Sequence, residues 1–293
     1  MPGACWRRSG WRRRWPREAS DAGAADVIRA RKRFGQHFLH DPAVIARILQ
    51  AIALEPGDAA VEIGPGRGAL TARLLAAAGR LDAVEIDRDL AAALQARLGT
   101  QPGWTLHRED ALETDWRALA AARGARLRVV GNLPYNVSTP LLFRLLDAGD
   151  AIRDMHVMLQ KEVVDRIVAA PGSRDYGRLG VMLAARVRAS RLFEVGAGAF
   201  QPAPRVQSAL VRLEVIDSPP EWSREPLYGE LVTAAFGQRR KTLRNALRDY
   251  LSADAIGAIG IDPGARAETL AADQFGALAR AARAARATAA AIR

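Results

Sequence analysis

The sequence predicts an α/β protein whose core is a doubly wound, mostly parallel sheet, followed by a small all-helical C-terminal domain. Short apolar segments alternate with segments of helical spacing between about residues 59 and 168, as in a parallel sheet with helices on both faces. A glycine-rich turn joins the first apolar segment to its helix. The alternation ends at Ser218, because the two prolines that follow can continue neither a central strand nor a helix.

These features divide the chain into three parts. Residues 1–26 show a period of neither 2 nor 3.6, and we predict a disordered basic tail there. Residues 27–217 form the predicted α/β domain, and residues 218–293 form the predicted helical domain. The tail admits three interpretations: an arginine-rich transit peptide, a basic arm that binds RNA, or functionless residues upstream of the true start codon.

The elements follow in order from about Arg33, where ordered structure is expected to begin. The first helix is predicted to start at Pro42, with Asp41 as its N-cap. Apolar segments predict strands at residues 59–63, 81–86, 104–107, 127–130, 155–159 and 209–216, the last as an antiparallel edge strand. Helical spacing predicts helices at residues 69–78, 90–98, 140–146 (capped by Thr139), 161–168 and 268–282, and a helix start at Asp262-Pro263.

Composition excludes several classes of protein. Nearly half of the residues, 49%, are hydrophobic, which is enough for a buried core. No apolar run reaches the roughly 18 residues that a membrane span needs. A single cysteine, Cys5, excludes an intramolecular disulfide and a cysteine metal cluster, and is typical of a reducing compartment. We therefore expect a cytoplasmic protein without a membrane span. We also predict, independently of composition, that it acts as a monomer and without a metal ion.

The net charge of +11 favours an anionic partner such as a nucleic acid. Its distribution weakens this argument. Residues 1–33 carry ten Arg or Lys and three acidic residues, a net charge of +7, which leaves only +4 for the rest of the chain. Nucleic-acid binding must therefore be argued from the site and from local basic segments.

The glycine-rich turn spans residues 61–68, between a predicted strand and a predicted helix. Glycine lets the backbone turn sharply and lets a ligand approach closely, and the helix start offers free N–H groups. The spacing from Gly64 to Ala69 also satisfies a loose dinucleotide fingerprint, with Glu85 about 20 residues further on as a ribose-binding acid. A nicotinamide or flavin cofactor therefore remains open on this motif alone.

Two features favour S-adenosylmethionine instead. A compact run of three alternating glycines preceded by Glu62 resembles the first motif of class I methyltransferases. Asp110 follows the third predicted strand, where that family has an acid for the adenine amine of the cofactor. This resemblance implies that Glu85 binds the ribose hydroxyls and that Asp110 accepts a hydrogen bond from the adenine amine.

The segment 132–135 (Asn-Leu-Pro-Tyr) ends the fourth strand and predicts methylation of the exocyclic amine of adenine. That amine is a poor nucleophile, because its lone pair is delocalised into the ring. The amide oxygen of Asn132 and the main-chain carbonyl of Leu133 could accept its two protons, and Pro134 would hold the carbonyl in place. Tyr135 supplies a flat face on which the base could stack. A nicotinamide enzyme has no use for this segment.

Seven short motifs occur in order: residues 34–39 (FGQHFL), 61–68 (VEIGPGRG), 85–87 (EID), 109–111 (EDA), 131–136 (GNLPYN), 159–163 (LQKEV) and 200–208 (FQPAPRVQS). Together they resemble the ribosomal RNA adenine dimethyltransferases, from about Arg33 to Leu251. The likeness is greatest to the bacterial branch that dimethylates two adjacent adenines in the 3′-terminal hairpin loop of 16S rRNA. The resemblance implies that the partner is this RNA, within the 30S subunit or its precursor.

The same resemblance assigns further residues. His37 and the backbone of Leu39 would contact the methionine end of the cofactor, Gly64 would lie against it, and Asn132 would touch it as well. Phe200 would cover the target base on the face opposite Tyr135. The sequence departs from the family at His37, where asparagine is usual, and at residues 195–199, where glycine and alanine replace the usual prolines.

Basic residues provide the predicted RNA contacts. The run 238–244 lies in the helical domain, and Arg178 and Arg205 flank the expected cleft. Two alternatives to the 16S enzyme remain. One is the related 23S rRNA methyltransferase that confers macrolide resistance, and the other is a non-catalytic RNA-binding factor with the same fold.

Overall fold

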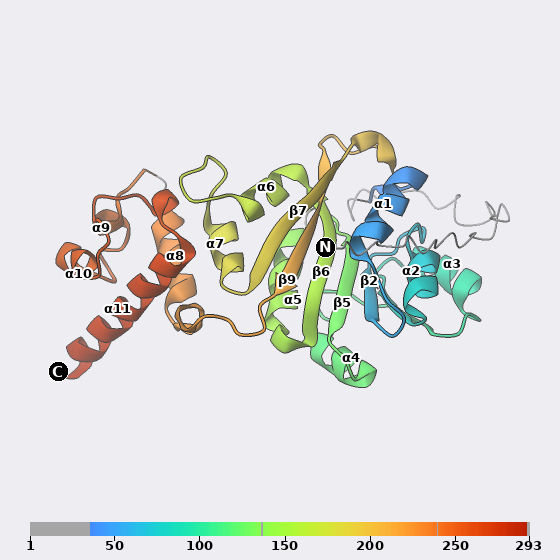
Figure 1. Ribbon diagram of the computed structural model, residues 1–293, viewed down its shortest axis with the longest axis horizontal. Coiled ribbons are helices and arrows are strands. Elements are labelled where there is room, and N and C mark those ends of the chain that lie inside the picture. The colour runs from blue at the N-terminus through green and yellow to red at the C-terminus, as the bar shows by residue number, and fades with distance from the viewer. Residues whose placement is uncertain (1–35, 136, 239, 292–293) are drawn as a thin grey trace, which may run out of the picture.

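The computed structural model describes residues 36–135, 137–238 and 240–291. The tail predicted at residues 1–26 and the start of order near Arg33 lie outside these ranges. Seven strands form one sheet in the order β4-β3-β2-β5-β6-β9-β7 (Figure 1). They are β2 (Ala59–Ile63), β3 (Leu81–Val84), β4 (Trp104–His107), β5 (Leu127–Asn132), β6 (Ile152–Gln160), β7 (Val187–Val195) and β9 (Ser208–Val215).

Strands β2 to β6 run parallel, and β9 is antiparallel to both of its neighbours, β6 and β7. The chain winds from β2 outward to β3 and β4 and then returns to place β5 on the other side of β2. This reversal opens a crevice at the carboxyl ends of β2 and β5, the usual ligand site of such sheets. The predicted doubly wound, mostly parallel sheet is confirmed.

Successive side chains along each strand point to opposite faces of the sheet, and each face packs against its own apolar core. Val61 belongs to a cluster with α4 (Trp116–Arg123), α5 (Ser138–Asp147) and α6 (Lys161–Val168). Its neighbour Ala60 belongs to a cluster with α1 (Pro42–Ile52) and α2 (Thr71–Ala78). The period of two along a strand thus produces the three-layer architecture. The remaining crossover helix is α3 (Arg88–Leu98), between β3 and β4.

A second, two-stranded sheet joins distant parts of the chain. Strand β1 (Phe38–Leu39) pairs antiparallel with β8 (Phe200–Gln201), and the N–H of His40 donates to the carbonyl oxygen of Ala199 over 2.9 Å. This pairing holds the segment before α1 against the segment that leads into β9. The segment before α1 lines the crevice.

The C-terminal helices pack around an apolar cluster of their own, on the far side of α6 and α7 (Figure 1). They are α8 (Tyr228–Phe236), α9 (Leu243–Ala246), α10 (Ala253–Ala258) and α11 (Ala272–Ala291). Helix α7 (Arg178–Ala184) precedes residue 218 yet shares this cluster. The hydroxyl of Tyr228 donates to the carbonyl oxygen of Val181 over 2.9 Å, which ties the helical lobe to α7.

The strand predictions hold within a few residues, with one wrong placement. The strand predicted at residues 209–216 is antiparallel as expected, but it is not at the edge, because β7 pairs along its outer side. Strand β7 was not predicted from the sequence, because polar and charged residues such as Arg188 and Glu194 interrupt its apolar pattern. Helix α4, which is capped by Asp115, was also missed.

Asp41 caps α1 as predicted and accepts hydrogen bonds from the N–H groups of Ala43 and Val44. Thr139 does not cap α5, which starts at Ser138 without a side-chain cap. Asp262-Pro263 does not start a helix, because the Asp262 carboxylate accepts from the N–H of Gly264 within a turn.

The predicted helix at residues 268–282 begins later and continues further than expected, as α11 (Ala272–Ala291). Glu268 lies in a short 3-10 turn, Ala267–Thr269. The amide oxygen of Gln274 then reaches back to accept from the N–H of Ala271 over 2.9 Å, in the manner of a capping box. This cap explains why the helix starts where it does.

Candidate active site

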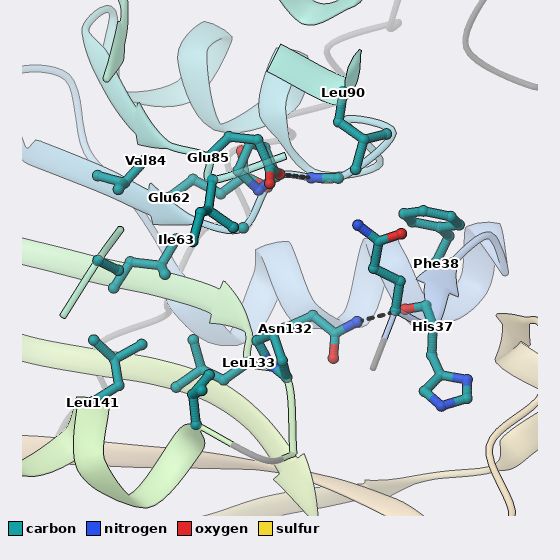
Figure 2. A pocket seen from close by; sticks show the side chains of 18 of the residues that line it. His37, Phe38, Glu62, Ile63, Val84, Glu85, Leu90, Asn132, Leu133 and Leu141 are labelled. Carbon is teal, nitrogen blue, oxygen red and sulfur yellow. Dashed lines mark hydrogen bonds between the residues drawn. The ribbon is translucent and has the colours of Figure 1, made fainter. Parts of the chain in front are cut away.

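A cavity opens at the carboxyl ends of the parallel strands (Figure 2). It encloses about 1120 Å³ when the space open to solvent is included. Its walls come from the ends of β2, β3 and β5, from the segment after β4 and from β1. Eight of the predicted site residues line it: His37, Leu39, Gly64, Glu85, Asp110, Asn132, Leu133 and Tyr135.

The glycine turn has the geometry that the sequence predicts. Gly64 and Gly66 have φ angles of +64° and +58°, a region that favours glycine because a Cβ would be strained there. A Cβ on Gly64 would meet no protein atom within 4 Å, so this glycine faces open space in the cavity. A Cβ on Gly66 would lie 3.1 Å from the Phe38 ring, which packs over the turn.

Glu85 follows the end of β3 and is buried beside the glycine turn. One carboxylate oxygen accepts from the N–H of Gly66 over 3.1 Å, and the other accepts from the N–H of Asp87 over 2.9 Å. Burial raises the pKa of Glu85, and these main-chain donors oppose that rise. The donors fix the carboxylate at the cavity wall, and each oxygen keeps a lone pair for a ligand hydroxyl.

Glu62 is the buried acid of the glycine motif, and its side chain is only 3% exposed. Burial raises the pKa of Glu62 to about 7, and the nearby Glu85 adds to the effect. The nearby Thr71 hydroxyl lowers this pKa, but Oε2 of Glu62, which lines the cavity, has no partner of hydrogen-bonding geometry among the described residues. A buried acceptor without a partner favours a ligand that carries positive charge, as the sulfonium and ammonium groups of S-adenosylmethionine do.

Asp110 lies after the end of β4, as the sequence predicts. Its Oδ1 accepts from the N–H of Leu112 over 2.9 Å, which orients the carboxylate. The adjacent Glu109 accepts from the hydroxyl of Thr114 over 2.9 Å. Glu85 and Asp110 therefore border one cavity, from the ends of two neighbouring strands.

Asn132 ends β5, and its side chain is held in one orientation. Nδ2 donates to the main-chain carbonyl oxygen of His37 over 2.9 Å (Figure 2). Because a carbonyl oxygen can only accept, the amide nitrogen must face His37, and the amide oxygen points away from it. The N–H of Leu133 donates to the carbonyl oxygen of Met158 over 3.2 Å, which anchors the next residue on β6.

Tyr135 borders the cavity and carries two contacts. Its hydroxyl shares a hydrogen bond of 2.9 Å with the hydroxyl of Ser208, the first residue of β9. Its ring is stacked against the imidazole of His37, with ring centroids 5.7 Å apart and an angle of 28° between the planes. The His37 Nδ1 also lies 2.7 Å from the carbonyl oxygen of Pro202.

Phe200 is the one predicted site residue that does not line the cavity. It lies in β8 opposite Leu39 of β1, and it is only 3% exposed within the apolar cluster of that face. The structure therefore brings together the predicted cofactor and amide residues with Tyr135, and it leaves Phe200 packed in the core behind them.

Ile86 and Phe38 are among the lining residues to which the sequence assigned no role. Ile86 is 48% exposed, an unusual exposure for a large apolar side chain, and it follows Glu85 at the rim. Phe38 packs over the glycine turn, with the guanidinium of Arg67 centred 4.6 Å from its ring. An apolar residue directly after an acid at a strand end was the only available signal for Ile86.

The predicted RNA-binding residues lie away from this cavity. Arg178 is exposed at the start of α7, and Arg205 is exposed in the segment between β8 and β9. In the basic run, Arg240, Lys241 and Arg244 are exposed near α9, whereas Arg239 lies outside the described residues.

Within the described residues there is neither a membrane-spanning helix nor a cluster of metal ligands. No helix among them is both long enough and apolar enough to cross a bilayer. No group of three or more His, Cys, Asp and Glu side chains in the described part of the chain is arranged to hold a metal ion.

Comparisons with known proteins agree with this geometry. The model of the family described as ribosomal RNA adenine dimethylase matches residues 27–283. A ribosomal RNA small subunit methyltransferase A from Pseudomonas aeruginosa is 52% identical over 243 residues, which cover 83% of this chain and 90% of the relative. The protein of that name from Methylococcus capsulatus is 53% identical over 250 residues, covering 85% and 96% of the two chains.

Solved structures show the same fold. A dimethyladenosine transferase from Plasmodium falciparum superimposes with a TM-score of 0.70 at 22% identity, over 83% of this chain and 96% of that one. The 23S rRNA methyltransferase ErmE superimposes with a TM-score of 0.65 at 26% identity, over 84% and 99% of the two chains. The predicted class I methyltransferase fold is thereby confirmed.

Proposed function

Because this chain belongs to the ribosomal RNA adenine dimethylase family, we propose that it methylates N6 of two adjacent adenines in the 3′-terminal hairpin loop of 16S rRNA. The observation that carries the proposal is the oriented amide of Asn132 beside Tyr135 in the cavity. Relatives that are 52–53% identical over more than four-fifths of this chain are named for the small ribosomal subunit, which favours 16S rRNA over 23S rRNA.

S-adenosylmethionine is the cofactor of this family, and when bound it supplies an electrophilic methyl group. The hydrogen-bonding groups around the cavity suit this cofactor. Glu85 would accept from the ribose hydroxyls, Asp110 from the adenine amine, and the unpaired oxygen of Glu62 would face the positive charge. Gly64 would leave room for the ligand, because a side chain there would project into the cavity.

Two groups of the chain would prepare the amine of the target base. The Asn132 oxygen and the Leu133 carbonyl oxygen would accept hydrogen bonds from its two N–H groups, which favours rehybridisation of N6 and localises the lone pair on nitrogen instead of in the ring. Their positions are set in advance by the bonds to His37 and Met158, so little reorganisation is needed at the moment of reaction. Asn132, His37 and the backbone of Leu39 would also touch the methionine end of the cofactor.

Tyr135 would stack on the target base, and Ser208 would hold the phenol ring in place through its hydroxyl. Phe200 would cover the opposite face of the base. That role requires Phe200 to leave the apolar cluster in which it is packed, because a ring that is 3% exposed cannot contact a base. The contact of Phe200 with RNA therefore remains a prediction that depends on movement of β8.

The RNA would extend from the cavity toward the helical lobe. Exposed Arg205, Arg178 and Arg244 supply positive charge for phosphates, which gives affinity without sequence choice. The division at residue 218 into a methyltransferase domain and an RNA-binding domain also remains a prediction. Three further statements remain predictions: that the partner is the 30S subunit or its precursor, that the protein is a monomer, and that it is cytoplasmic.

Methyl transfer from tritiated S-adenosylmethionine to purified, unmethylated 30S and 50S subunits tests the proposal. We expect label on 30S only, in the 3′-terminal hairpin, at two N6,N6-dimethyladenines. Label on 50S alone would establish the 23S alternative instead. Label on neither subunit, together with intact RNA binding, would favour the non-catalytic assembly factor.

A further inference from the structure

The imidazole of His37 lies against one face of the Tyr135 ring, the ring on which the target base would stack. Its centroid is 5.7 Å from that of Tyr135 and the planes differ by 28°, which is the geometry of an aromatic pair. A purine inserted between the two rings would need them about 7 Å apart, since each stacked contact takes about 3.5 Å. The His37 side chain therefore blocks one face of Tyr135 in the protein without RNA.

The backbone of His37 is fixed within the fold, whereas its ring makes a separate set of contacts, with Tyr135 and Pro202. The carbonyl oxygen accepts from Asn132, and the next two residues form the strand that pairs with β8. The ring itself has one hydrogen bond, from Nδ1 to the carbonyl oxygen of Pro202 over 2.7 Å, at an exposed position. The side chain can therefore rotate away without disturbing the Asn132 amide.

We propose that His37 is a displaceable cover for the stacking face of Tyr135, and that the target adenine must displace the imidazole before methyl transfer. The inference rests on the proposed function, because it assumes that a base stacks on Tyr135. It makes His37 a positioning residue that competes with the base, in addition to any contact with the cofactor.

Two substitutions separate the ring from its hydrogen bond. His37→Asn removes the aromatic ring, and His37→Phe keeps a ring but loses the donor to Pro202. We expect His37→Asn to lower KM for hairpin RNA about 2- to 10-fold at saturating cofactor, the range that one aromatic pair represents. The substitution should change KM more than kcat, because the imidazole is displaced before the methyl group is transferred. His37→Phe should not lower KM more than about twofold.

An increase in KM for His37→Asn would overturn the proposal, because the ring would then help to hold the base. Equal KM values for both variants and the wild type would overturn it as well. Calorimetric titration of each variant with S-adenosylhomocysteine separates a change in cofactor affinity from a change in RNA affinity. Loss of methyl transfer to 30S by the wild type would refute the proposed function itself, which distinguishes the two failures.

A measurement on the wild type does not depend on the stability of a variant. The chain has only four histidines, so the ring protons of His37 can be assigned by NMR. We expect a nuclear Overhauser effect between the rings of His37 and Tyr135 in the free protein, and its loss at saturating hairpin RNA. Persistence of the effect in the complex would show that the imidazole is not displaced.

Discussion

The side-chain amide of Asn132 is locked to the main-chain carbonyl oxygen of His37 over 2.9 Å, although the two residues are 95 positions apart in the chain. This bond selects the amide orientation in which the oxygen is free to meet a substrate amine. It also couples the end of β5 to the segment before α1.

Asn132→Ala removes that oxygen. We expect kcat for methyl transfer to fall by at least about 100-fold, as when one preorganised hydrogen-bonding group is removed from an active site. Affinity for S-adenosylhomocysteine should change far less, because Glu85 and Asp110 remain. Single-turnover kinetics and calorimetry measure the two effects. Turnover equal to the wild type would show that the catalytic segment lies elsewhere.

Tyr135 is predicted to act through its ring rather than its hydroxyl. Tyr135→Ala should lower kcat/KM by about 10- to 100-fold, which corresponds to ~1–3 kcal/mol of lost stacking. Tyr135→Phe is the matched control. It keeps the ring and loses only the hydrogen bond to Ser208, so it should retain more than about a tenth of the activity. Equal losses in both variants would assign the role to the hydroxyl.

Glu62 makes stability depend on pH in a predictable direction. Its pKa is about 7 in the folded protein and 4.5 in the unfolded chain, so the folded state binds the proton more tightly. The free energy of unfolding should therefore fall as pH rises from about 4.5 to 7, by up to ~3 kcal/mol, and then level off. Urea denaturation between pH 5 and 8 measures this.

Glu62→Gln is the matched variant for this measurement. The difference in stability between Glu62→Gln and the wild type should grow with pH up to about 7 and stay constant above it, because only the wild type loses a proton there. A difference that is independent of pH would show that Glu62 is ionised throughout, and that its environment is more polar than the structure indicates.

Arg128 stabilises the opposite end of the sheet from the cavity. Its buried guanidinium binds Asp58 and Asp154, and it donates to the carbonyl oxygens of Ile52 and Ala53 at the end of α1. Burial alone would raise the pKa of both aspartates. The N–H of Glu55 beside Asp58, the imidazole of His156 beside Asp154 and the Arg128 guanidinium beside both hold these pKa values below the usual range.

Arg128→Leu should lower the free energy of unfolding by ~3–5 kcal/mol, because it removes the buried cation that Asp58 and Asp154 share. Arg153→Ala serves as the control. Arg153 also pairs with Asp58, but its side chain is largely exposed, so its removal should cost less than ~1 kcal/mol. Chemical denaturation checks both values. A loss below ~1 kcal/mol for Arg128→Leu would contradict the structural role of the cluster.

Residues 1–26 carry six arginines, yet the proposed site does not require them. Deletion of this segment should leave methyl transfer to 30S within about twofold of the full chain at physiological salt. If affinity for the RNA fell by an order of magnitude or more, with a shallower dependence on salt, the basic-arm interpretation of the tail would be correct.

The sequence alone determined the order of six of the strands, the glycine turn and eight of the residues around the cavity. These are local properties. Apolar periodicity, the Asp41 cap and the positive φ angles of Gly64 and Gly66 each depend on a few neighbouring residues. Motifs that end successive parallel strands must also meet at one edge of the sheet, so Glu85, Asp110 and Asn132 could be grouped in advance.

Only the tertiary structure decided how these residues are oriented and which of them are accessible. Strand β7 was hidden by its charged residues, and it displaced β9 from the edge through pairing that sequence periodicity cannot report. The bond between Asn132 and His37, and the burial of Phe200, depend on the pairing of β1 with β8. Such contacts join residues far apart in the chain, and no local pattern encodes the energy gained when they meet.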